Sequence, residues 1–146
     1  HGGWSEWASL GGKITTPPAC AVAQDGSNTY KCLAAGTDGR LWVYGANPKG
    51  TFGWSLFGGE TSFRASPVYI SGDNVMQVYI TDQSASIARA TWQKLGGLSG
   101  WEQLTGPEGS GPSCVVAGHV SPLKPIVKCF ARGTDGSVES ATITPN

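Results

Sequence analysis

The sequence repeats with a period of about 47 residues, and this repeat constrains the fold more than any other feature. The same step is kept by three tryptophans and by the glycines that follow them: Trp7, Trp54, Trp101, Gly12, Gly59 and Gly106. Three units, approximately 1–47, 48–96 and 97–146, fill the whole chain. We therefore expect a single repeat domain over residues 1–146.

A second phrase recurs downstream of each tryptophan. Cys32–Leu41 reads CLAAGTDGRL and Cys129–Val138 reads CFARGTDGSV, whereas the second unit carries a weaker copy at Val78–Ile87. Asp-Gly accepts the positive φ angles that a tight hairpin requires. The phrase therefore predicts a strand, a turn and another strand in each unit.

Each unit reads as four short strands. The first carries the repeated tryptophan, and the second follows a proline: Pro18, Pro67 or Pro112. The third ends at the turn, and the fourth begins there, so the stretch Ile87–Leu95 is expected to be a strand. With 22 glycines and only 14% charged residues, the composition also favours an all-β fold. Four strands per unit is the blade of a β-propeller.

Three blades cannot close a ring, and the two chain ends suggest how one could form. The strand Ser137–Ile143 lacks a following tryptophan strand, while the chain begins with a surplus one at Trp4. We expect a half propeller that a second chain completes, giving a six-bladed homodimer or a higher homo-oligomer. A β-trefoil, also built from three repeats, is the alternative.

Four cysteines predict two disulfides. Cys20 and Cys32 lie on either side of a turn at Gly26, and Cys114 and Cys129 hold the matching places in the third unit. The second unit lacks both cysteines, with Tyr69 and Val78 in their stead. We predict Cys20–Cys32 and Cys114–Cys129, against an alternative of four free thiols. Disulfides indicate an oxidising compartment, so we expect the mature form of a secreted, extracellular protein.

Several function classes are disfavoured. A net charge of zero without a basic run argues against nucleic-acid binding, and no apolar stretch is long enough for membrane insertion. No catalytic motif occurs, so we expect neither an enzyme nor a cofactor or metal. One remote alternative is a copper-binding oxidase that uses the N-terminal His1 with His119.

The phrases Trp4–Gly12 and Ala35–Trp42, with a proline-led strand between them, resemble the repeat of the PLL-like β-propeller lectins. The resemblance spans all three units and is weakest in the second. It implies a ring of about seven blades with pockets for fucose-type and O-methylated sugars between the blades. This chain differs from the family in repeat number, in its disulfides and in the second unit.

Sugars stack on aromatic rings and need fixed hydrogen-bond partners. Trp42 and Tyr44 are expected to form an exposed pair on one strand face, because the second unit has alanines at both matching positions. The full candidate set adds the repeated tryptophans, which could instead pack between blades, one isolated tryptophan, and charged residues near the turns: Trp7, Trp54, Trp101, Trp92, Asp38, Arg40, Arg132 and Asp135.

The sequence thus predicts a non-catalytic carbohydrate-binding protein, multivalent through its repeats and through oligomerisation. Its expected partners are glycans and further copies of itself. The alternative is a structural or adhesive module in which the same aromatic residues form protein–protein contacts.

Overall fold

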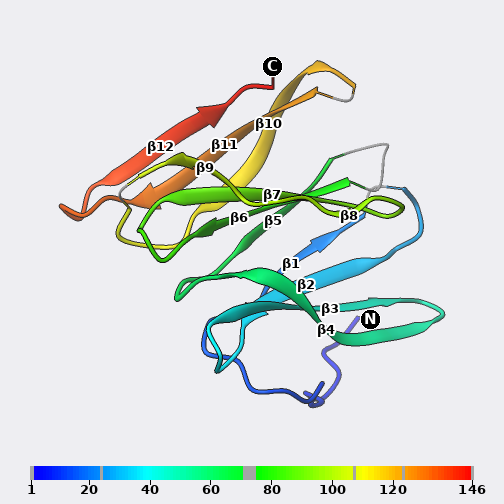
Figure 1. The fold of residues 1–146 in the computed structure, drawn as a ribbon. Helices are drawn as coiled ribbons and strands as arrows, with labels where there is room; N and C mark the ends of the chain where they lie inside the picture. The colour runs from blue at the N-terminus through cyan, green and yellow to red at the C-terminus, as the bar shows by residue number, and fades with distance from the viewer. Residues whose placement is uncertain (1, 24, 71–74, 107, 123, 146) are drawn as a thin grey trace.

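The computed structural model describes residues 2–23, 25–70, 75–106, 108–122 and 124–145 (Figure 1). These residues form twelve strands and no helix, in three separate antiparallel sheets. The first sheet has the order β1 (Ala19–Val22), β2 (Tyr30–Ala35), β3 (Arg40–Asn47) and β4 (Gly50–Glu60). The second contains β5 (Ser66–Ile70), β6 (Val75–Thr81), β7 (Ile87–Gln93), β8 (Gly97–Leu98) and β9 (Glu102–Thr105). The third contains β10 (Ser113–Ser121), β11 (Lys124–Arg132) and β12 (Val138–Ile143).

An all-β fold is therefore confirmed, and Ile87–Gln93 is a strand as expected. The described strands close no barrel, so the β-trefoil alternative gains no support. No helix among the described residues is long and apolar enough to cross a membrane.

Each sheet contains one turn of the same geometry, which joins β2 to β3, β6 to β7 or β11 to β12. In each, the backbone N–H of one residue donates to the carbonyl three residues earlier: Gly39 to Gly36, Ala85 to Asp82, and Gly136 to Gly133. The three donors have φ angles of 76°, 62° and 86°. The second turn thus keeps the shape of an Asp-Gly turn although it contains no glycine, and Ser84 occupies the place of Asp38.

The last strand of the first and second sheets comes from the next sequence unit. β4 carries Trp54, and β8 and β9 lie on either side of Trp101. The expected opening strand of the first unit does not form, because residues 2–13 are in no strand. In the described part of the chain, β12 pairs only with β11, so the third sheet lacks the strand that the other two receive.

The three sheets pack against one another with the second in the middle (Figure 1). One core cluster joins the first and second sheets around Leu33, Leu41, Met76 and Val78. Another joins the second and third sheets around Tyr79, Ile87, Val127 and Cys129. Alternate residues of β6 point to opposite sides, so the second sheet is buried on both faces.

Both predicted disulfides are confirmed. Cys20 lies directly opposite Cys32, and Cys114 lies opposite Cys129, each pair across a hairpin. In the second sheet Val78 faces Pro67 rather than Tyr69, so the expected alignment of Tyr69 with Cys20 is wrong by two residues. Two disulfides fit a protein of an oxidising compartment.

Replacement of both Cys114 and Cys129 by alanine should lower the free energy of unfolding by about 3 kcal/mol. The reason is that a loop of this size restricts the unfolded chain by about that amount. Urea unfolding followed by tryptophan fluorescence would measure the change. A loss below about 1 kcal/mol would contradict this account of the crosslink.

Candidate functional site

A cavity of about 420 Å³ lies beside the turn of the first sheet. Two tryptophan rings, Trp42 from β3 and Trp54 from β4, line it together with the turn residues Gly36–Asp38 and the N-terminal segment Gly12–Ile14. Both tryptophans are half-buried. The cavity is therefore mostly apolar, with one carboxylate at its edge.

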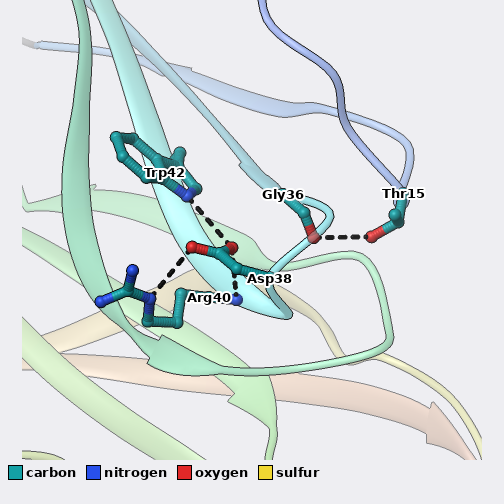
Figure 2. A network of polar contacts seen from close by, with 5 residues as sticks. All are labelled: Thr15, Gly36, Asp38, Arg40 and Trp42. Atoms are coloured by element: carbon teal, nitrogen blue, oxygen red, sulfur yellow. Dashed lines mark hydrogen bonds and ion pairs between the residues drawn. The ribbon is translucent and has the colours of Figure 1, made fainter.

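Asp38 is the centre of a polar network at this edge (Figure 2). Its Oδ1 accepts hydrogen bonds from the backbone N–H of Arg40 at 3.1 Å and from Trp42 Nε1 at 3.3 Å. Arg40 Nε donates to Oδ2 at 3.0 Å. Desolvation raises the pKa of Asp38, but these hydrogen bonds and the Arg40 charge outweigh it and hold the pKa below its ordinary value. The carboxylate is therefore ionised at neutral pH and fixes the Trp42 ring.

The segment before β1 forms one side of this cavity and is attached at two points. Thr15 Oγ1 donates to the carbonyl of Gly36 at 3.2 Å, which ties the segment to the turn (Figure 2). Further back, the carbonyl of Leu10 accepts a hydrogen bond from Trp54 Nε1 at 3.1 Å. A Cβ on Gly12 would lie 3.5 Å from the same nitrogen. The segment therefore holds the Trp54 ring in place.

Tyr44 does not form the expected exposed pair with Trp42. Tyr44 is only 7% exposed, and its ring packs on that of Trp54 with the centroids 5.5 Å apart. That prediction is therefore wrong, because the tryptophan of the next unit covers Tyr44. Trp54 takes its place in the cavity wall.

The second sheet has a cavity of about 370 Å³ at the corresponding place, lined by Trp101, Gly59 and Gln103 among others. Two acidic residues line it, Glu60 and Asp82. Asp82 is the first residue of the turn, and its Oδ2 accepts a hydrogen bond from Gln103 Nε2 at 3.0 Å. Desolvation raises the pKa of Asp82, but its hydrogen bonds outweigh this effect and keep the pKa below its ordinary value. Ala88 stands where the first sheet has Trp42, so Trp101 is the one tryptophan that borders this cavity in the described part of the chain.

The third sheet has a smaller cavity of about 110 Å³, lined by Glu108 and Glu139 among others. Glu139 lies at the same distance from its turn as Trp42 does, and Glu108 bridges to Gly133 as Ile14 bridges to Gly36. At these two matching positions the third cavity therefore has carboxylates where the first has Trp42 and Ile14.

Glu108 is one of the two acidic residues that line this third cavity. It is 9% exposed, and its Oε2 has no hydrogen-bond partner among the described residues. Burial, followed by the charge of Glu139, raises the pKa of Glu108. The side chain is therefore easier to protonate than an ordinary glutamate.

The remaining candidates lie elsewhere. Asp135 accepts hydrogen bonds from the backbone and hydroxyl of Ser137, and Arg132 donates to the carbonyl of Gly109; neither lines the third cavity. Trp7 is 99% exposed. The copper-binding alternative gains no support. His119, on β10, lies opposite Pro125 of β11, and His1 is outside the described residues.

Trp92 borders a different cavity, of about 380 Å³, between the first and second sheets. The ammonium of Lys31, from β2, lies 3.1 Å from the centroid of its indole ring. Burial lowers the pKa of Lys31 to about 8. Trp92 thus contacts a cation of the neighbouring sheet and does not line the cavity at Trp42.

Some residues of these sites escaped sequence analysis. Ile14 and Gln103 carry no motif, because their roles depend on which turn they face. The repeated glycines did carry a signal, since Gly12 lies against Trp54 and Gly59 lies against Trp101. Each of these two glycines leaves room for the tryptophan of the following unit.

Comparison with known proteins gives a structural match but no sequence match. No family model matches the chain, and neither does any curated protein. Among solved structures, a fucose lectin from Kordia zhangzhouensis, in complex with methyl-fucoside, is similar with a TM-score of 0.60 and 16% identity. The alignment covers 89% of this chain and 94% of that chain. The chain therefore has an all-β fold shared with a lectin.

The contact between Gly59 and Trp101 can be tested with Gly59→Ala. Gly59 has a φ of +77°, and an added Cβ would lie 2.6 Å from the Trp101 ring. The matched control is Gly53→Ala, with a φ of +70° and no heavy atom within 4 Å of the added Cβ. We expect backbone strain of about 1–2 kcal/mol in both variants and about 1–3 kcal/mol more for Gly59→Ala. Equal stability losses in denaturant unfolding would show that the ring does not pack there.

Proposed function

We propose that this protein is a lectin that binds a fucose-type or O-methylated sugar in the cavity between Trp42 and Trp54. The observation that carries the proposal is the pairing of two half-buried indole rings with an ionised carboxylate at the cavity edge. Sugar C–H groups and methyl groups pack on aromatic rings, while a fixed carboxylate accepts hydrogen bonds from hydroxyls.

The residues have separate roles in this proposal. Trp42 and Trp54 provide the stacking surfaces, and Ile14 provides an apolar contact for a methyl group. Asp38 accepts a hydrogen bond from a sugar hydroxyl. Arg40 positions Asp38, because its Nε is engaged with the carboxylate and its side chain does not line the cavity.

The structural similarity to a fucose lectin supports a carbohydrate ligand. The cavity at Trp101, which also combines an indole ring with a carboxylate, gives the chain a second place for a sugar. We further propose that the sheets are propeller blades, that the chain is half of a ring completed by another copy, and that it acts outside the cell without catalysis. Linked weak sites would then gain avidity.

Trp42→Ala should weaken binding of methyl α-fucoside at least about tenfold while the fold is kept, because Ala88 already occupies the matching place in the second sheet. Phe52→Ala is the matched control, since Phe52 is also an aromatic residue, is 65% exposed and does not line this cavity. Isothermal titration with the methyl glycoside would measure both.

If Trp42→Ala binds the sugar as the unchanged protein does, the Trp42 cavity is not the site. If neither the unchanged protein nor any variant binds methyl α-fucoside or an O-methylated monosaccharide, the ligand class is wrong. In that case the exposed aromatic residues would belong to a protein–protein interaction module.

A further inference from the structure

The forward faces of the three sheets differ sharply in exposure. The forward face is the face of a sheet that points toward the following sheet along the chain. Residues at matching distances from the three turns mark it: Leu33 and Leu41 in the first sheet, Tyr79 and Ile87 in the second, Phe130 and Val138 in the third. The first four are at most 3% exposed, because each forward face packs on the following sheet. Phe130 is 42% exposed and Val138 is 82% exposed. Among the described residues, nothing covers this apolar face of the third sheet.

The opposite, rear face shows the reverse pattern. Val78 of the second sheet and Cys129 of the third are buried against the preceding sheet. The first sheet has no preceding sheet, and on its rear face Val22, Tyr30 and Leu56 are 38–50% exposed, although Ala34 and Tyr44 of the same face are buried. The described part of the chain thus has one uncovered forward face and one partly uncovered rear face, which are the two kinds of face that pack together twice inside the chain.

The strand pairing of the backbone is also incomplete at both ends of the stack of sheets. β3 and β7 each have a neighbouring strand on both sides, whereas β12 pairs only with β11 in the described part of the chain. At the other end, residues 2–13 form no strand, and Trp4 and Trp7 are almost fully exposed. Figure 1 shows this segment and β12 at opposite ends of the stack of sheets, so the segment of one chain cannot reach its own β12 in this fold.

The strand pairs of the first and second sheets show which residues would lie opposite one another if the N-terminal segment of another copy were added to β12. Leu56 lies opposite Trp42, and in the second sheet Gln103 lies opposite Ala88. Ser9 precedes Leu56 by one repeat, as Leu56 precedes Gln103. The same alignment in the third sheet therefore places Ser9 opposite Glu139, and hence Trp7 opposite Ala141.

We propose that a second copy of this chain closes the structure, with its residues 4–11 added to β12 as a fourth strand. The forward face of each third sheet then packs on the rear face of the partner copy's first sheet. A two-fold axis makes both contacts identical, so the assembly closes as a dimer without open ends.

This dimer also completes a binding site, a step that rests on the proposed lectin function. Trp7 of one copy would lie over Gly106 of the other, as Trp54 lies against Gly12 inside one chain. The third cavity would thereby receive its missing indole ring, beside Glu108 and Glu139. The third site exists only in the dimer and is more acidic than the first.

Engineered disulfides test the alignment. The double variant Ser9→Cys, Glu139→Cys should form a covalent dimer on oxidation, seen on a non-reducing denaturing gel and assigned by peptide mapping. The control Ser9→Cys, Ser140→Cys places the second cysteine one residue out of register and on the other face of β12, and should remain largely uncrosslinked. A bond between the two introduced cysteines within one chain, or equal crosslinking in both variants, would overturn the proposal.

Val138→Asp tests the interface with little risk to the fold, because Val138 is 82% exposed in the single chain. The unchanged protein should sediment as a dimer at low micromolar concentration, and the variant as a folded monomer. A monomeric unchanged protein, or a dimeric Val138→Asp, would refute the interface. Neither measurement includes a sugar, so a failure here leaves the proposed lectin function to be judged by the Trp42→Ala titration.

Discussion

The backbone hydrogen bonds between β3 and β4 join residues of one sequence unit to residues of the next, and those between β7 and β9 do the same. The sheets are thus offset from the sequence units, because the outer strand of each of these two sheets comes from the following unit. A unit therefore cannot form its sheet alone, and each boundary between units lies inside a sheet. The offset also carries the tryptophan of one unit onto the glycine of the unit before it. The order of strands in the sheets and the position of the cavities follow from it.

The sequence was sufficient to predict the features that depend on local or periodic signals. The repeat, with its paired cysteines and Asp-Gly turns, predicted β-structure, the turns and both disulfides. Trp42 and Asp38, two of the candidate sugar-binding residues, line one cavity. Their role in binding stays a prediction.

What could not be predicted depends on contacts between distant segments. Tyr44 shares a strand face with Trp42, but only the tertiary structure shows that Trp54 covers it. Trp92 has no sequence feature that assigns it to Lys31, which is far from it in the chain. The repeat predicts an opening strand at Trp4, yet a strand needs a neighbour for its backbone groups, and the described residues of one chain offer none there.

The two-sided burial of the second sheet explains how it holds together without a crosslink. Packing on both faces supports its hairpin, whereas the first and third sheets each have one covered face and one disulfide. The redox state of the surroundings therefore acts on the two ends of the stack and not on its centre. These ends are also the surfaces through which the proposed dimer would form. Cys129 belongs to the core cluster between the second and third sheets, whereas Cys20 lies exposed on the rear face of the first sheet. Reduction would therefore weaken the core packing of one outer sheet and a contact surface of the proposed dimer on the other.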